Sequence, residues 1–481
     1  MRASRHRLLL AVLLLIFLGI GLRSAFAYSL LTHEQLIDLT WDDSIVPFLL
    51  SRYPNLTPSE LERARAYAYG GCVIQDIGYY PFGRTFLSNL THYVRSGDFV
   101  INLFRDAQNV NELAFAVGAL SHYIGDIYGH SLAVNLAVPI EYPKLGDRYG
   151  NVVSFAEGEH QHVQTEFAFD INEIAHHRMA PVQYLRHIGL AVPTRQLSLA
   201  FYQTYGLDEK FSGIRRMHVN VGGYRFAVRA FIPRIAYAIT LLHRKIEPTD
   251  STTPEAIALH QEIERMAVQN QWDKYRHHAG IGTYMLAGLI CILPKIGPLK
   301  LLAVKGPTDA TEAEYTHSLV VSVESMRGVL SQFTPSELRH ARLRASSSEA
   351  EAPPRQVTNP KEEIFQQSDD SRHPLPNRDL DTGDMVRPGG YPLTDATFAQ
   401  LLHVLTRHPT QSIPSGIKTS ILAYYADSDI PINAKKDPEK WKRVKADLET
   451  LTAIPTSPEP EVFPTYGEKE SLSSGVLGNQ R

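Results

Sequence analysis

The chain has 481 residues, of which 43% are hydrophobic and 21% charged, and its formal net charge at pH 7 is -3. This length allows two or three domains, and the charge shows none of the basic excess that is typical of nucleic-acid-binding proteins. A nuclease is only weakly disfavoured, because an enzyme need not hold its substrate by charge alone. Only two cysteines, Cys72 and Cys291, are present, so disulfides do not hold the fold together.

Residues 1–27 have the pattern of a secretory signal peptide. Three arginines precede an uncharged apolar run from Leu8 to Leu22, and Ala25-Phe26-Ala27 fits a small-x-small cleavage site. The apolar run is short for a membrane span. We therefore predict an exported protein, secreted or periplasmic, whose mature chain begins at Tyr28.

Apolar residues recur at spacings of three and four through residues 28–250, which predicts an all-α domain. The expected helices include Glu60–Tyr69, Phe99–Ala107, Glu112–His130 and Phe226–Leu242. Ahead of the first of these, Thr57-Pro58-Ser59-Glu60 has the residues of a capping box with proline at the first helical position.

A helical extension is expected over residues 251–345. It contains Ala279–Pro294, an apolar run without charge that is marginal in length for crossing a bilayer. Two interpretations stay open: a buried helical hairpin, and an element that lies on a membrane surface.

The remaining chain divides by composition. Residues 346–376 are predicted to be a disordered linker, residues 377–454 a small helical region, and residues 455–481 a disordered tail. Helices are expected near Thr397–Thr406 and Pro438–Leu451. The acidic run Asp379–Asp384 could bind calcium, but a solvated turn is favoured.

The most informative stretch is His122-Tyr-Ile-Gly-Asp126-Ile-Tyr-Gly-His130. Residues four apart project from one face of a helix, so His122 and Asp126 can close on one divalent cation. Burying an aspartate among apolar residues is costly unless something cationic pairs with it. The alternative is structural: a core histidine bonded to a carbonyl, or a plain His–Asp pair.

Further candidate ligands lie in order along the same domain. His162-Val-Gln-Thr-Glu166 repeats the spacing of four and is expected to begin a helix, and Asp76 follows a pair of glycines that allows close backbone approach. His33 and His92 complete the set. Each residue taken singly is more often structural or solvated.

In order, residue type and spacing, this set resembles the zinc-dependent phospholipase C family and its relatives, the single-strand-specific zinc nucleases. The motifs extend from Tyr28 to Glu166, and the helical character continues to Leu242. The resemblance implies an all-helical enzyme with up to three zinc ions. Their ligands would be Asp76, His92, His122 and Asp126 for the first ion; Asp126, His33 and the backbone amine and carbonyl of Tyr28 for the second; and His130, His162 and Glu166 for the third.

The sequence departs from the family pattern in several places. The mature chain would begin with tyrosine where the family has tryptophan, and His130 follows His122 by eight residues rather than ten. The third site is therefore the least secure, and His160 is an alternative to His162. The segment between His130 and His162 is longer than expected and could form a lid or rim.

The resemblance implies phosphodiester hydrolysis by a zinc-activated water. Asp76 is our candidate for orienting that water or accepting its proton. Glu166 favours the phospholipases, which act on phospholipid at a membrane surface, because the nucleases usually carry aspartate there. The spacing between Tyr28 and His33 is closer to that of the nucleases, whose partner would be nucleic acid. A zinc-binding protein without turnover is the third possibility.

Overall fold

The computed structural model describes residues 30–80, 83–209, 211, 219–243, 248–276, 280–293, 303–332, 373–426 and 437–458. The predicted signal peptide, Tyr28, most of the predicted linker and most of the predicted tail lie outside these residues. Within them the fold is all-α, as predicted. The strands described there are β1 (Ile413–Pro414) and β2 (Thr456–Ser457), which pair in parallel.

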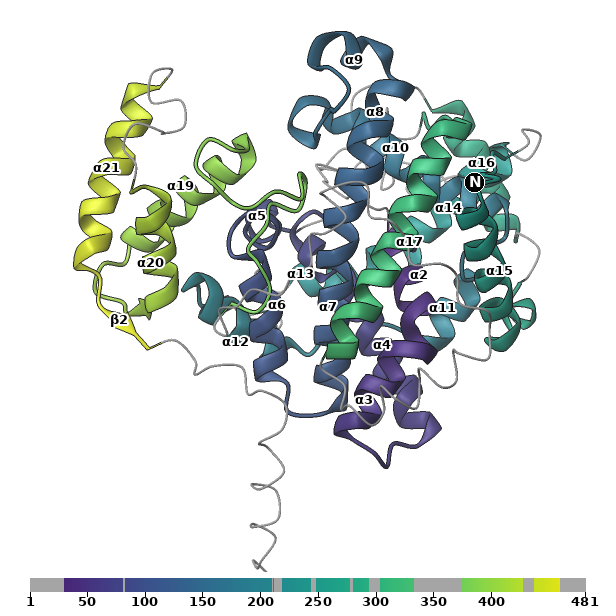
Figure 1. Ribbon diagram of the computed structural model, residues 1–481, viewed down its shortest axis with the longest axis horizontal. Helices are drawn as coiled ribbons and strands as arrows, with labels where there is room; N and C mark the ends of the chain where they lie inside the picture. The colour runs from purple at the N-terminus through teal and green to yellow at the C-terminus, as the bar shows by residue number, and fades with distance from the viewer. Residues whose placement is uncertain are drawn as a thin grey trace, which may run out of the picture.

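The longer helices follow one another along the whole chain (Figure 1). Their bounds are α2 (Leu30–Thr40), α3 (Val46–Arg52), α4 (Pro58–Gly71), α5 (Thr85–Tyr93), α6 (Ser96–Asp106), α7 (Val110–Gly129), α8 (Asn135–Glu141), α9 (Pro143–Tyr149), α10 (Phe155–Ala175), α11 (Val182–Ile188), α12 (Thr194–Tyr205), α13 (Val219–Phe226), α14 (Ile232–His243), α15 (Pro254–Gln269), α16 (Ile281–Ile292), α17 (Asp309–Gln332), α19 (Pro392–Thr406), α20 (Ser415–Tyr424) and α21 (Pro438–Ala453). Short π-helical turns are η1 (Trp41–Ile45), η3 (His130–Val134) and η5 (Ala227–Phe231), and short 3-10 turns are η2 (Ile74–Gly78) and η6 (Trp272–Lys274).

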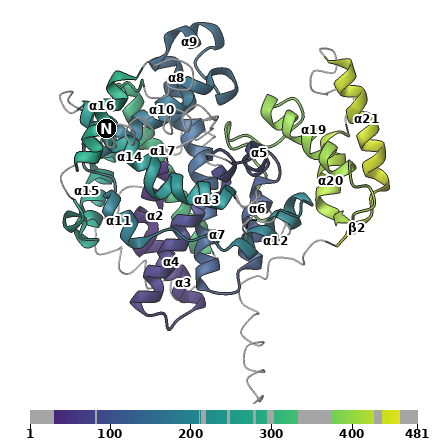
Figure 2. The same cartoon turned by 180° about the vertical axis from the view of Figure 1, so that it is seen from behind.

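Helix α7 is the central element of the fold. Every residue from Leu113 to Gly129 is buried, and α4, α6 and α17 pack against it. A helix that is buried on all sides must be covered on all sides, and the two views show its neighbours around it (Figures 1 and 2).

Two glycines set the close contact between α4 and α7. A Cβ on Gly71 would lie 2.1 Å from the Phe115 carbonyl oxygen, and one on Gly118 would lie 2.2 Å from the Ala68 carbonyl oxygen. Any side chain at either position would therefore push the helices apart. The pair Gly70-Gly71 predicted a close backbone approach. That approach is present at Gly71, and it brings the segment that carries Asp76 against α7.

Local signals predicted helix starts well where the caps were recognised. The capping box of Thr57 and Glu60 begins α4 as expected. Helix α10 begins at Phe155, seven residues before the predicted start at His162, because Ser154 and Glu157 form a second capping box. Helix α20 was not predicted.

The described part of the segment Ala279–Pro294 is one helix, α16, and residues 294–302, which follow it, lie outside the described residues, so the hairpin interpretation stays untested. Ala287 and Ile290 are buried, on the side where α16 packs against α14, whereas Ile281 and Ile292 are 80% and 78% exposed. Among the described residues, the stretch Val221–His243 is long and apolar enough to cross a membrane. Core helices of soluble proteins pass the same test, and this stretch is partly buried in the fold.

Of the C-terminal helices, α19 packs against α5 and α20 against α12, while α21 lies on their outer side, and the chain ahead of α19 continues inward along α5 (Figures 1 and 2). The favoured interpretation of Asp379–Asp384 as a solvated turn was wrong. The side chains of Asp379 and Asp381 are buried, and the Leu380 N–H donates to the His92 carbonyl oxygen at 3.1 Å. The sequence gives no sign of this contact because its partner lies almost 300 residues away.

Candidate metal centre

Helix α7 presents three candidate ligands on successive turns of one face. His122 and Asp126 lie within the helix, and His130 begins the π-helical turn η3 that continues it. All three side chains are fully buried. The spacing of four along a regular helix is sufficient to align them.

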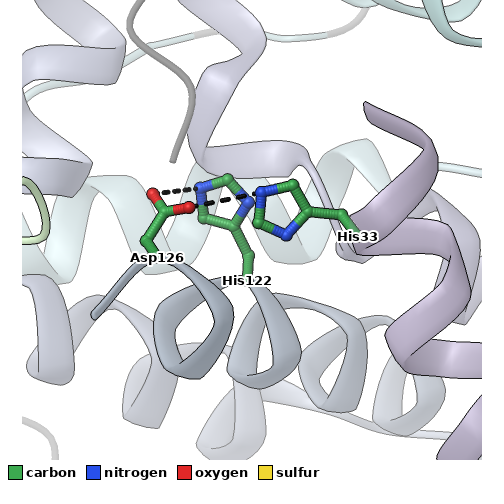
Figure 3. Close-up of side chains that lie close together, drawn as sticks. All are labelled: His33, His122 and Asp126. Carbon is green, nitrogen blue, oxygen red and sulfur yellow. Dashed lines mark ion pairs between the residues drawn. The ribbon is translucent and has the colours of Figure 1, made fainter. Parts of the chain in front are cut away.

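The Asp126 carboxylate lies between two sets of histidines. Its Oδ1 is 3.2 Å from His33 Nε2, while its Oδ2 is 3.1 Å from His122 Nε2 and 3.2 Å from His92 Nε2. Figure 3 shows the two oxygens directed at His33 and His122, whose rings stack with centroids 4.3 Å apart. Two oxygens that face different donor sets are the arrangement by which one carboxylate can bridge two metal ions.

Asp76 joins the set formed by His92 and His122. It comes from η2, and its Oδ1 lies 3.3 Å from His92 Nε2 and 3.9 Å from His122 Nε2. Gln75 next to it donates to the Ala119 carbonyl oxygen of α7, and Thr91 on α5 donates to the Gln75 carbonyl oxygen. These hydrogen bonds hold η2, α5 and α7 together around Asp76.

A separate ligand group forms around His130, one turn beyond Asp126, where η3 continues α7. His130 Nδ1 lies 2.8 Å from His162 Nε2, which in turn lies 3.2 Å from Glu166 Oε1. His160 is exposed, whereas His162 is buried, so the structure brings His162 and not His160 to this group. The shorter spacing between His122 and His130 does not prevent the convergence.

Backbone carbonyls fix the orientation of two histidines. His122 Nδ1 lies 3.1 Å from the Cys72 carbonyl oxygen, and His92 Nδ1 lies 2.7 Å from the Ser88 carbonyl oxygen. A carbonyl oxygen can only accept, so each Nδ1 carries the proton and each Nε2 offers its lone pair to the centre.

His33 reaches the centre because α2 is anchored at its start. Asp170 on α10 accepts hydrogen bonds from the backbone N–H groups of Leu31 and Thr32 at 3.0 and 3.1 Å. On the opposite side, a Cβ on Gly125 would lie 3.3 Å from His33 Nδ1, so the absence of a side chain there lets the imidazole approach α7.

Burial and mutual charge shift the pKa values of these groups in opposite directions. Burial raises the pKa values of Asp76 and Glu166, and the nearby Asp126 charge raises them further. Burial also disfavours the charged form of Asp126, but its interactions with His122, His33 and His92 hold the pKa of Asp126 well below its usual range. Burial lowers the pKa values of His130 and His162, which keeps their rings neutral and able to bind a metal.

The donor set fits zinc. Both oxygens of Asp76, Asp126 and Glu166 are buried and lack hydrogen-bond partners, and their near neighbours are imidazole nitrogens. Three groups have donor atoms within 4.8 Å of one another: His33, His122 and Asp126; Asp76, His92 and His122; His130, His162 and Glu166. Neutral imidazoles mixed with carboxylates suit zinc better than magnesium or calcium, which prefer oxygen alone.

A comparison with protein families decides the class of this domain. Residues 32–210 match the model of the family described as zinc dependent phospholipase C. This part of the chain belongs to the zinc-dependent phospholipase C family. No curated protein and no solved structure matches the chain.

All the candidate ligands described by the structure lie within the zinc-dependent phospholipase C domain. The structure brings together His33, Asp76, His92, His122, Asp126, His130, His162 and Glu166. Tyr28 lies outside the described residues, so its amine and carbonyl stay a prediction, as does the catalytic role of Asp76. The segment expected to form a lid or rim contains η3, α8 and the largely exposed α9, which precede α10.

Sequence reasoning missed one buried acid beside this domain. Asp381, from the region after the predicted linker, lies with its Oδ1 3.6 Å from His130 Nε2. The only local signal was the acidic run Asp379–Asp384, and nothing in it indicated that His130 was the neighbour.

Proposed function

We propose that the protein is an exported zinc-dependent phosphodiesterase of the phospholipase C type, which hydrolyses the head-group phosphodiester of phospholipids. The observation that carries this proposal is the Asp126 carboxylate, whose two oxygens face two different histidine sets at 3.1–3.2 Å. The family of residues 32–210 supports a phospholipase C-like hydrolase. Export rests on the pattern of residues 1–27.

The proposed centre holds up to three zinc ions. His92, His122 and Asp76 with Asp126 would hold one, and His33 with Asp126 and the Tyr28 backbone would hold another. His130, His162 and Glu166 would hold the third. When bound, zinc supplies Lewis acidity toward phosphate oxygens and lowers the pKa of a coordinated water towards neutrality.

The chain's own groups position the reaction. Asp76 would orient the attacking water and accept its proton, because its carboxylate is buried and both its oxygens are left without hydrogen bonds. The carbonyls of Cys72 and Ser88 keep the Nε2 lone pairs of His122 and His92 directed at the centre. Full burial of these side chains strengthens their electrostatic interactions with a bound phosphodiester.

Phospholipid is the preferred substrate class because an apolar surface accompanies the centre. Ile281, Tyr284, Met285 and Ile292 on α16 are all more than half exposed, at 80%, 51%, 54% and 78%. Helix α16 packs on α14, and α14 packs on α10, the helix that carries His162 and Glu166. We propose that α16 contacts the membrane.

A single-strand-specific nuclease is the second candidate function. It is favoured by the five-residue spacing from the predicted mature terminus Tyr28 to His33. Glu166 and the exposed apolar side chains of α16 favour the phospholipase.

The test is a parallel assay on zinc-loaded protein that begins at Tyr28. Phospholipid vesicles and single-stranded DNA are offered separately, and phosphorylated head groups and nucleotides are measured as products. Asp126→Asn serves as the blank, and Asp384→Asn, an exposed position, serves as the matched control that should keep full activity.

Each outcome decides between the candidate functions. Head-group release that is lost in Asp126→Asn and kept in Asp384→Asn supports the proposal. Hydrolysis of DNA alone moves the protein to the nuclease branch. Bound zinc without turnover of either substrate contradicts both functions and favours a binding protein.

A further inference from the structure

The chain between the predicted linker and α19 is built into the zinc-dependent phospholipase C domain. Besides the contact between Leu380 and His92, Asn135 Nδ2 donates to the Asp381 carbonyl oxygen at 2.7 Å. Gly383 has φ of +74°, and a Cβ there would lie 3.2 Å from the Ile127 carbonyl oxygen of α7. The segment therefore lies directly on the helix that carries the candidate ligands.

Asp381 projects from this segment to the third ligand group. Its side chain is fully buried, and its Oδ2 accepts hydrogen bonds from the hydroxyls of Tyr93 at 2.8 Å and Tyr391 at 2.7 Å. Its Oδ1 has no hydrogen-bond partner and lies 3.6 Å from His130 Nε2, which has none either. Two tyrosines thus hold one oxygen and leave the other directed at the histidine.

His130 differs from His92 and His122 in how its second nitrogen is placed. Those two histidines direct Nδ1 at a backbone carbonyl oxygen and Nε2 at the centre. His130 directs Nδ1 at His162 and Nε2 at Asp381. Metal-binding histidines usually donate their other N–H to a carbonyl or a carboxylate, which fixes the tautomer and the ring orientation.

We propose that Asp381 is a positioning residue of the third metal site: it accepts the Nε2–H of His130 and keeps the Nδ1 lone pair available for zinc. The proposal rests on the zinc site put forward under the proposed function. Asp381 acts through His130, because the donor atoms that gather within 4.8 Å are those of His130, His162 and Glu166 alone.

The hydrogen bond between Asp381 and His130 would require the 3.6 Å between Oδ1 and Nε2 to shorten. His130 Nδ1 and His162 Nε2 lie 2.8 Å apart, so one of the two rings would have to move if both nitrogens are to bind one zinc ion. Asp381 lies beside the other nitrogen of His130, where it can accept a hydrogen bond from the displaced ring.

The experiment measures zinc binding, not turnover. Zinc content and the affinity of each bound ion are measured by competition with a chelator, on full-length mature protein and on Asp381→Ala, Asp381→Asn and Asp384→Asn. Glu166→Gln identifies the third ion, because it removes a direct ligand of that site only. The absorption spectrum of the cobalt-loaded proteins reports the coordination of the ion.

We expect Asp381→Ala to lower the affinity for one zinc ion by about 10–100-fold, the range for residues that hydrogen-bond to metal ligands. The weakened ion should be the one that Glu166→Gln removes. Asp381→Asn should recover part of the loss, because its amide oxygen can still accept the Nε2–H, and Asp384→Asn should bind zinc like the wild type.

Three results would overturn the proposal. Unchanged affinities in a folded Asp381→Ala protein would show that the carboxylate does nothing for His130. An equal weakening of all ions would mean that the segment is only structural. Complete loss of the third ion, with a changed cobalt spectrum in Asp381→Asn, would make Asp381 a direct ligand. Failure of the proposed function is separate, because it would appear as zinc-loaded wild-type protein that hydrolyses no phospholipid.

Discussion

Asp126 on α7 and His130 at the start of η3 lie one turn apart, yet their surroundings are assembled in different ways. Around Asp126, three histidines lie within 3.2 Å of its carboxylate, and two of these have their second nitrogen fixed by a backbone carbonyl, that of Ser88 for His92 and that of Cys72 for His122. Around His130, the neighbours are His162 and Asp381, which come from α10 and from the chain beyond the predicted linker.

One face of α7, continued by η3, therefore presents ligands to two kinds of site. The described ligand groups on the Asp126 side lie within residues 32–210, and the proposed Tyr28 backbone ligands precede them. The ligand group on the His130 side lies within the same residues, whereas the proposed positioning residue Asp381 lies beyond them. We therefore expect changes at the Asp126 side to abolish activity, and changes at the His130 side to reduce it in steps.

The largest effect is expected from Asp126→Asn. An amide has one oxygen acceptor and no charge, so it cannot bridge two ions. Hydrolysis should fall by at least about a thousandfold, since metal ions supply several kcal/mol of transition-state stabilisation. Zinc-binding measurements should show a lower affinity for the two ions that Asp126 would bridge and an unchanged affinity for the third. Full activity in Asp126→Asn would show that Asp126 does not bridge two ions, and the proposed difference between the Asp126 and His130 sides would then be wrong.

Next in size is the effect of one extra residue before Tyr28. An extended chain has no free amine at the predicted ligand position, and the hydrogen bonds from Leu31 and Thr32 to Asp170 leave α2 little freedom to compensate. Activity should drop by about a hundredfold, or about 2.7 kcal/mol in activation free energy. The control is the same extended protein after proteolytic removal of the added residue. Equal rates before and after removal would show that the amine is not a ligand.

A smaller effect is expected from Gly125→Ala, which tests the short-range geometry of the Asp126 side. The added methyl would lie 2.8 Å from Leu36 Cδ1 and 3.3 Å from His33 Nδ1, so Leu36 must shift and His33 must give way slightly. The affinity for the zinc ion bound by His33 should fall by about tenfold, or about 1.4 kcal/mol in binding free energy. Chelator competition can measure this, with Gly222→Ala as the control because a Cβ there meets nothing within 4 Å. Loss of the third ion instead would show that the two sides are not independent.

The last prediction concerns stability and not activity, at Asp106, a partly buried carboxylate of the same domain outside the metal groups. Burial raises the pKa of Asp106 to about 6, although Gln203 donates to one of its oxygens at 3.1 Å. The unfolded pKa is lower, so wild-type stability falls as the pH rises from about 4 to about 6. Asp106→Asn should not lose this stability and should be more stable by about 1–2 kcal/mol above pH 6, a value reduced for partial exposure.

Chemical denaturation of both proteins at pH 4 and pH 7.5 measures the Asp106 effect. A difference between the two proteins that does not change with pH would contradict the assignment. The result gives the free energy of partly burying a carboxylate that has no candidate metal ligands around it, as a reference for the buried carboxylates of the metal groups.

Short-range features of this protein followed from the sequence alone. The helical period predicted the all-α fold, and the capping box predicted the start of α4. The spacing of four placed His122 and Asp126 on one face of α7, because helix geometry is local and repeats. The order of the remaining candidates indicated the family that the comparison then found.

Tertiary structure decided which residues meet across long distances in the chain. The sequence left His160 as an alternative to His162, but packing of α10 exposes the first and buries the second. The acidic run Asp379–Asp384 reads as a solvated turn, yet Asp381 is buried beside His130. The physical reason is that a periodic pattern shows which face of a helix is buried, whereas the partner of a buried polar group is set by the packing of the whole fold.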